Sequence, residues 1–257
     1  MEILIIAIVA FLASFLTLFS GFGLGTILTP AFILFFPVEI AIALTGIVHL
    51  LNNIFKVFLL GKNADRYVLL RFGVPAIIGA FVGANLLFTL SDSQPLLKYD
   101  LFDNRYEITS VKLVVALMMI TFAIIEIIPK FKNLQFDTNR LIPGGLISGF
   151  FGGLSGHQGA LRSAFLIKCG LSKEAFIATG VIIACFVDFT RITIYFRNLL
   201  MTGITDNLSI VLAAAISAFA GAFIGKKMLK KITLKTVQLI VSVMIVMLGV
   251  GLGSGII

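Results

Sequence analysis

Ionisable and amide side chains interrupt long apolar stretches at two places in the sequence. His49, Asn52 and Asn53 interrupt one stretch, and Asp188 and Arg191 interrupt another. Charged groups are costly in apolar surroundings, so they usually face a cavity or one another. The guanidinium and the amides can bind an anion, and a histidine or a carboxylate can carry a proton. Because Asp188 and Arg191 lie one helical turn apart, a mutually neutralising pair is the alternative.

Two glycine-rich motifs add main-chain groups that can bind an anion. The first reads Ser20-Gly21-Phe22-Gly23-Leu24-Gly25-Thr26, and the second reads Ser155-Gly156-His157-Gln158-Gly159-Ala160. A helix that begins directly after such a break points free N–H groups and a positive dipole end at a ligand. We expect the second break to include Gly152 and Gly153 as well. Close packing of helices through glycine is the alternative, and for Gly79/Gly83 and Gly221/Gly225, four residues apart, it is favoured.

Arg162 follows the second break and brings a planar fork that suits oxyanions. For Lys56, binding an anion and snorkelling to the membrane interface both remain open. We find neither a His-x-x-x-His spacing nor a nucleophile–base pair, so we expect no metal, no cofactor and no catalytic residue. The candidate substrate-binding residues are Gly21, Gly23, Gly25, Thr26, Thr45, Asn52, Asn53, Ser155, Gly156, His157, Gln158, Gly159, Arg162, Thr179 and Arg191. The candidate proton carriers are His49, His157 and Asp188.

The elements that must position these residues are apolar helices long enough to span a bilayer. The chain of 257 residues is 59% hydrophobic and only 12% charged, whereas a soluble domain carries about twice that charge. A spanning helix needs about 20 apolar residues, and the apolar runs do not alternate as the strands of a membrane barrel would. The sequence therefore predicts an all-α polytopic membrane protein. The predicted helices cover about 3–19, 24–36, 39–60, 70–90, 112–129, 140–154, 160–170, 174–197, 208–226 and 235–256.

The two halves of the chain repeat the same motifs in the same order. Thr45-Gly46 corresponds to Thr179-Gly180, and the pair Asn53 and Lys56 corresponds to Asp188 and Arg191. This duplication predicts two transmembrane repeats, residues 1–130 with a polar extracytoplasmic loop at 91–111, and residues 131–257. Each repeat is predicted to be a glycine-broken helical hairpin plus three transmembrane helices. An odd number of crossings then gives the two repeats inverted topologies.

The basic residues provide an independent indication of that topology. The inverted arrangement places most of them on one side: Lys62, Arg66, Arg71, Lys130, Lys132, Arg140, Lys168, Lys173, Lys226, Lys227, Lys230, Lys231 and Lys235. The positive-inside rule makes that side cytoplasmic and both termini extracytoplasmic. The net charge of +8 then meets anionic lipid head groups and not nucleic acid. We expect lipid or the second protomer of a homodimer against the faces rich in Phe, Ala and Gly.

The sequence resembles the sulfite exporter TauE/SafE family, which includes permeases of the 4-toluene sulfonate uptake type. The resemblance is carried by Gly21 through Pro30, by Phe36-Pro37-Val38-Glu39, and by Gly144-Gly145 through Gly156. It implies an inner-membrane secondary transporter for a small sulfur oxyanion or organosulfonate, such as sulfite or sulfoacetate. Export by alternating access, coupled to protons, is the leading hypothesis; an anion channel or an uptake permease for another small organic anion is the alternative. His157, Gln158 and Arg162 stand where many members have a further glycine-rich run.

Overall fold

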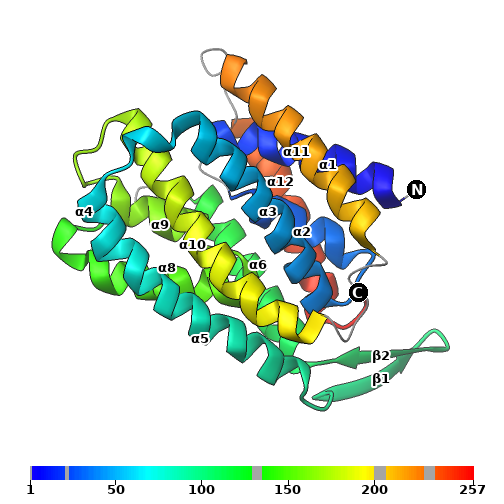
Figure 1. The fold of residues 1–257 in the computed structure, drawn as a ribbon. Helices are drawn as coiled ribbons and strands as arrows, with labels where there is room; N and C mark the ends of the chain where they lie inside the picture. The colour runs from blue at the N-terminus through cyan, green and yellow to red at the C-terminus, as the bar shows by residue number, and fades with distance from the viewer. Residues whose placement is uncertain (1, 21–22, 129–134, 200–206, 229–234) are drawn as a thin grey trace.

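The computed structural model describes residues 2–20, 23–128, 135–199, 207–228 and 235–257, and it is a bundle of helices (Figure 1). The helices are α1 (Glu2–Ser20), α2 (Leu24–Ile33), α3 (Val38–Leu60), α4 (Arg66–Val68), α5 (Val74–Ser91), α6 (Ser110–Ile127), α8 (Leu141–Ser155), α9 (Gly159–Leu166), α10 (Lys173–Leu199), α11 (Leu208–Met228) and α12 (Lys235–Gly253). A π-helical turn (Leu69–Gly73) joins α4 to α5, and 3-10 turns cover Gly61–Asn63 and Thr138–Arg140. The predicted helix at 160–170 ends early, at Leu166.

Among the described residues, four helical stretches are long and apolar enough to cross a membrane. They are Val38–Phe58, Arg66–Ser91, Lys173–Phe196 and Leu208–Gly225. Shorter apolar helices cover Glu2–Phe15, Leu24–Ile33, Ser110–Ile125 and Val241–Gly253. These lengths agree with the multi-pass helical membrane protein that the sequence predicts.

Helices α5 and α8 pack with their main chains in direct contact. A Cβ atom added to Gly149 would lie 2.0 Å from the carbonyl oxygen of Ala76, and one added to Gly79 would lie 2.1 Å from that of Leu146. The same overlap with main-chain oxygens occurs at Gly83, Gly145, Gly153 and, between α11 and α1, at Gly221. Small residues at every fourth position let membrane helices approach this closely. The packing interpretation is therefore confirmed for Gly79, Gly83 and Gly221.

The second glycine break is shorter than the sequence predicts. Gly152 and Gly153 were expected in the break, but both lie inside α8. A Cβ atom at Gly153 would lie 2.2 Å from the carbonyl oxygen of Ala80, so this glycine serves helix packing. The chain leaves the helix at Gly156, whose φ of +82° lies in the left-handed region that favours glycine. The break consists of Gly156, His157 and Gln158.

Residues 91–111, predicted to be a polar loop, contain a β-hairpin that the sequence did not predict, within a chain that is otherwise mostly helical. Strands β1 (Leu97–Leu101) and β2 (Asn104–Ile108) pair antiparallel, with Phe102 and Asp103 at positive φ in the turn. Alternation places Leu97, Tyr99 and Leu101 on one face and charged residues on the other. Lys98 Nζ lies 2.7 Å from Glu107 Oε1, and this hydrogen bond lowers the pKa of Glu107.

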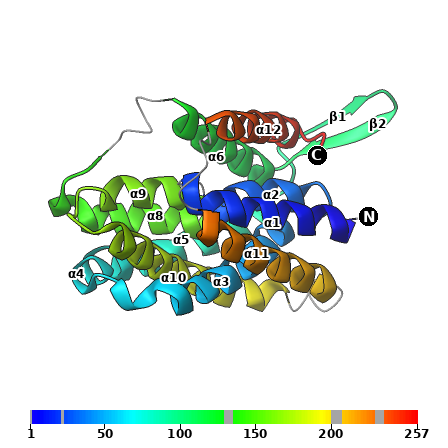
Figure 2. The same cartoon turned by 90° about the horizontal axis from the view of Figure 1, so that it is seen from above.

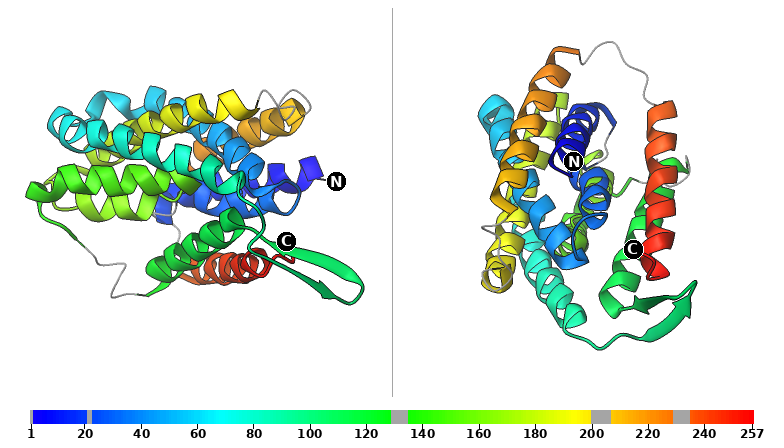
Figure 3. Two further views of the ribbon diagram at one scale, coloured as in Figure 1. Left: turned by 90° about the horizontal axis from the view of Figure 1, so that it is seen from below. Right: turned by 90° about the vertical axis from the view of Figure 1, so that its right-hand side faces the viewer.

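Each of four helices in the first half of the chain packs on a helix of the second half. Helix α1 packs on α11, α5 on α8, α3 on α10 and α6 on α12. Figures 2 and 3 show α6 and α12 side by side along one side of the bundle. Helices α3 and α10 run antiparallel, because Gly46 contacts Arg191 while His49, further along α3, contacts Asp188.

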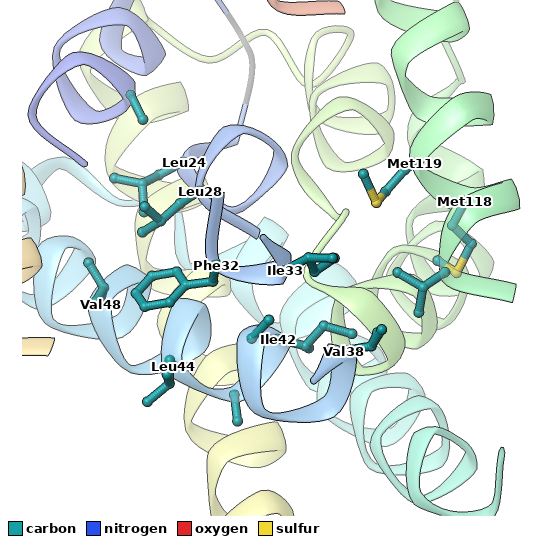
Figure 4. Close-up of a cluster of buried hydrophobic side chains, with 14 of the residues drawn as sticks. Leu24, Leu28, Phe32, Ile33, Val38, Ile42, Leu44, Val48, Met118 and Met119 are labelled. Atoms are coloured by element: carbon teal, nitrogen blue, oxygen red, sulfur yellow. The ribbon is translucent and has the colours of Figure 1, made fainter. Parts of the chain in front are cut away.

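The short helix α2 is anchored in the largest hydrophobic cluster of the described residues. Leu24, Leu28 and Phe32 on its length are almost completely buried. They pack among side chains of α3, with the methionines of α6 nearby (Figure 4). This packing fixes the N-terminus of α2, where Gly23 and Gly25 lie, against the centre of the protein.

Candidate functional site

The two glycine breaks meet in the interior of the bundle. A Cβ atom added to Gly25 would lie 3.2 Å from the carbonyl oxygen of Gly156 and 3.9 Å from Thr45 Cγ2. Gly23 is the N-cap of α2 in an extended conformation, and no side chain caps the helix there. Thr26 is buried, and its N–H donates to the carbonyl oxygen of Gly23. The start of α2 therefore lies directly against the second break.

Arg191 of α10 extends its guanidinium into this junction. A Cβ atom at Gly46 would lie 3.2 Å from Arg191 Cζ, and one at Gly156 would lie 2.8 Å from Arg191 Nη1. A larger residue at either position would force the Arg191 side chain to shift. Arg191 is 0% exposed, and Nη1 has no hydrogen-bond partner among the described residues. A buried guanidinium N–H that lacks a geometric hydrogen bond within the described residues therefore lies beside the main chain of the break, while the Tyr195 hydroxyl also interacts with the guanidinium.

Asp188 is the carboxylate that balances this charge. Its Oδ1 accepts a hydrogen bond from Arg191 Nε at 3.0 Å and lies 2.8 Å from Arg191 Nη2. Its Oδ2 lies 2.6 Å from His49 Nδ1 and accepts a hydrogen bond from Asn53 Nδ2 at 3.3 Å. The predicted neutralising pair is thus present, and His49 and Asn53 of α3 complete it.

Several buried polar atoms of α2, α3, α10 and the second break lack a hydrogen-bond partner in the described part of the chain. They are Thr29 Oγ1, Thr45 Oγ1, Asn52 Nδ2, His157 Nε2, Gln158 Nε2 and Arg191 Nη1. Leaving a buried polar group unsatisfied costs about 1–3 kcal/mol. All of these groups are donors or can act as donors. Thr45 and Arg191 flank the junction and Gln158 follows it closely, so an anion held there would satisfy donors from these side chains.

The second break supplies the side chains next to the junction. Gln158 is the N-cap of α9, and Gly159 is the first residue of that helix. His157 is 2% exposed; its Nδ1 lies 2.9 Å from Ser155 Oγ, and its ring stacks on Phe122 at 5.6 Å. The contacts with Ser155 of α8 and Phe122 of α6 hold His157 in place. Within the described residues, the Nε2 atoms of His157 and Gln158 have no hydrogen-bond partner.

Three of the predicted site residues lie elsewhere or cannot be placed. Thr179 is remote from Arg191, because its Oγ1 accepts the Asp65 N–H at 2.9 Å where α4 begins. Arg162 lies beside Gly180, with 3.4 Å between its Nε and a Cβ atom there. Gly21 falls outside the described residues. The sequence placed Arg162 and Arg191 in one cavity. In the structure, Arg162 of α9 lies beside Gly180 near the start of α10, whereas Arg191 lies further along α10.

Two contact residues were missed in the sequence. Gly46 was recognised only as a repeated glycine, although it makes room for Arg191. Tyr195 is fully buried and its hydroxyl donates to the carbonyl oxygen of Gly153. Its spacing of one helical turn from Arg191 was the signal that could have identified it.

Comparison with protein families gives a match over nearly the whole chain. The family model described as Sulfite exporter TauE/SafE matches residues 6–252. Neither the curated proteins nor the solved structures contain a match to the chain.

Proposed function

Because the chain belongs to the sulfite exporter TauE/SafE family over nearly its whole length, we propose that it is an inner-membrane secondary transporter. Its substrate is a small sulfur oxyanion or organosulfonate, such as sulfite or sulfoacetate. It exports this substrate by alternating access, coupled to protons. The observation that carries the proposal is the buried Arg191 Nη1, which has no hydrogen-bond partner among the described residues and lies at the junction of the two glycine breaks. Gly25, Thr45, Gly156, His157 and Gln158 complete the proposed anion site.

The proposal includes two repeats of inverted topology. The corresponding helices α3 and α10 run antiparallel. The first helix of the first half, α1, packs on α11 of the second half, and α5 packs on α8, the first helix of the second half. Both features support an inverted pair of halves, as does the distribution of lysines. Two half-helices that start from opposite sides then aim their N-termini at one substrate, an arrangement that suits an anion.

Burial of the site supports alternating access. Arg191, Asp188 and Gln158 are at most 1% exposed. An anion can therefore reach Arg191 only when the segments around the junction move. We propose that α2 and α9, the two short helices that follow the breaks, open the site to one side of the membrane and then to the other.

The proton in this proposal is carried by His49 and Asp188. Their 2.6 Å contact joins α3 to α10, the two helices that correspond across the repeat. Protonation of either group changes the charge beside Arg191 and so changes how strongly the guanidinium attracts a second anion. Proton binding and anion binding would be coupled through the Asp188 carboxylate.

Transport by purified protein in liposomes tests this proposal. We expect wild-type protein to move radiolabelled sulfite or sulfoacetate, and a proton gradient to accumulate the anion above its equilibrium level. Sulfate and a carboxylate such as acetate serve as competitors that define specificity. Empty liposomes measure passive leak. Flux that equilibrates but that no proton gradient drives uphill would favour an anion channel, and absence of flux for every sulfur anion would contradict the proposal.

A further inference from the structure

The β-hairpin formed by β1 and β2 has an open strand edge. In the part of the chain that the structure describes, the two strands form a sheet of their own, and the hairpin extends away from the helices (Figures 1 and 3). Two strands alone are only marginally stable in water, and an unpaired edge offers its N–H and C=O groups to another chain. Leu97 and Leu101 are 55% and 42% exposed, and Phe102 in the turn is 86% exposed. The hairpin therefore offers main-chain groups and apolar side chains to a partner.

The turn decides which main-chain groups point to the open edge of β1. A turn of two residues joins the strands, so Leu101 and Asn104 are the pair that flanks it. Such a pair exchanges hydrogen bonds, and the direction of the main-chain groups alternates along each strand. The N–H and C=O groups of Lys98 and Asp100 therefore point away from β2. Both residues are exposed.

The C-terminal segment covers part of the opposite edge, on β2. By the same alternation the carbonyl oxygen of Glu107 points away from β1. A Cβ atom added to Gly255 would lie 2.6 Å from this oxygen, and Lys112 Nζ donates to it at 3.5 Å. The Tyr99 hydroxyl donates to the carbonyl oxygen of Ser254 at 2.6 Å, which fixes the hairpin on the C-terminal segment. The edge that remains open to a partner is that of β1.

The sequence of β1 is complementary to itself. It reads Leu97-Lys98-Tyr99-Asp100-Leu101, with a cation and an anion at equal distances on either side of Tyr99. When two copies of β1 pair antiparallel with Tyr99 opposite Tyr99, Lys98 of each copy lies opposite Asp100 of the other. The outward main-chain groups of these residues then exchange hydrogen bonds. A two-fold axis at Tyr99 produces this interface, in which both copies use the same surface.

The charges favour this register over its neighbours. A register centred on Lys98 would place two lysines opposite each other, and one centred on Asp100 would place two carboxylates opposite each other. Like charges directly opposite destabilise a sheet. Within each hairpin, Lys98 lies opposite Glu107 and Asp100 lies opposite Arg105. A row across the four strands then reads Glu107, Lys98, Asp100 and Arg105, and the sign of the charge alternates from strand to strand.

We propose that the open edge of β1 is an interface with a second copy of this chain, and that two hairpins join into a four-stranded antiparallel sheet centred on Tyr99. The pairing satisfies the outward main-chain groups of β1. It also brings Leu97 of each copy beside Leu101 of the other. This proposal does not depend on which substrate the protein transports.

Disulfide cross-linking in proteoliposomes tests the register. The native Cys169 and Cys185 are first replaced by alanine. Because Leu97 lies opposite Leu101 of the second copy, a mixture of Leu97→Cys and Leu101→Cys proteins is expected to form a disulfide-linked dimer under a mild oxidant. Each variant alone is the matched control, because its two cysteines lie four residues apart along the strands, about 14 Å. We expect at least about tenfold less dimer from each control, since a disulfide cannot bridge that distance.

Charge substitutions separate loss of the interface from loss of folding. Lys98→Glu, added to both cysteine variants, places acids opposite each other and is expected to lower cross-linking by about fivefold or more. Asp100→Lys in both variants places lysines opposite each other and should have the same effect. A mixture of Lys98→Glu in one copy with Asp100→Lys in the other restores opposite charges at both contacts. We expect cross-linking to recover in that mixture, which also shows that both hairpins are folded.

Three results would overturn the proposal. The first is equal cross-linking by the single cysteine variants and by their mixture. The second is no cross-linking by a mixture whose melting temperature matches that of the wild type, which would leave the edge of β1 to a different chain. The third is cross-linking that the charge substitutions do not change.

Discussion

Replacing Asp188 by asparagine is expected to destabilise the protein more than replacing Asp188 and Arg191 together. Both side chains are 0% exposed, so Asp188→Asn leaves the Arg191 charge buried without its counter-ion. Removing one partner of a buried pair costs about 3–5 kcal/mol, whereas removing both charges is often nearly neutral. We therefore expect a large fall in the melting temperature of Asp188→Asn in detergent, and recovery in the double variant Asp188→Asn/Arg191→Gln.

The exposed pair Lys98–Glu107 provides the control for this comparison. Its atoms lie 2.7 Å apart and its side chains are about 40% exposed, and such pairs contribute about 0–1 kcal/mol. Glu107→Gln should leave the melting temperature almost unchanged. If Asp188→Asn melts like the wild type, the buried network around Asp188 is not the one described. If the double variant is as unstable as the single variant, the two charges do not balance each other.

Replacing Gly149 by valine is expected to prevent α5 and α8 from packing. Even a Cβ atom at this position would lie 2.0 Å from the carbonyl oxygen of Ala76. Because the obstacle is main chain, no change of rotamer can relieve it. We expect Gly149→Ala to cost about 1–3 kcal/mol through overpacking and Gly149→Val to cost more. Size-exclusion chromatography after heating would show early loss of the monodisperse peak for both.

Ile147 lies on the same helix and gives the matched control, because its side chain is 45% exposed. Ile147→Ala removes apolar atoms from the outer face of α8 and should change the stability by less than about 0.5 kcal/mol. A Gly149→Val protein as stable as the wild type would show that the two main chains do not touch.

Much of the architecture could be predicted from the sequence because membrane helices are encoded locally. Long apolar runs and the glycines between them predicted the helix ranges. The spacing of four residues between Gly79 and Gly83 predicted that these glycines serve helix packing. The hairpin was missed because its short alternation, Leu97 to Leu101, lies within a segment whose overall composition is polar. Gly153 was assigned to the wrong role because adjacent glycines serve both packing and a break.

The site was harder to predict than the fold. The sequence indicated that His49 and Asp188 were costly groups in need of partners, but their mutual contact joins residues 139 apart. The packing of α3 on α10 decides that contact, and no local pattern records it. The same packing moves Thr179 away from Arg191 and separates Arg162 from Arg191, although the repeat suggested one common level.

Equilibrium binding of radiolabelled sulfite to the purified protein tests the central claim most directly, namely that the junction of the two glycine breaks is an anion site built around Arg191. The comparison uses wild-type protein and the Asp188→Asn/Arg191→Gln variant, which retains the balance of buried charge. We predict saturable binding by the wild type that excess unlabelled sulfite displaces, and loss of sulfite affinity by at least about tenfold in the variant. Equal binding by the two proteins would contradict the claim, as would a wild type that binds no sulfur anion.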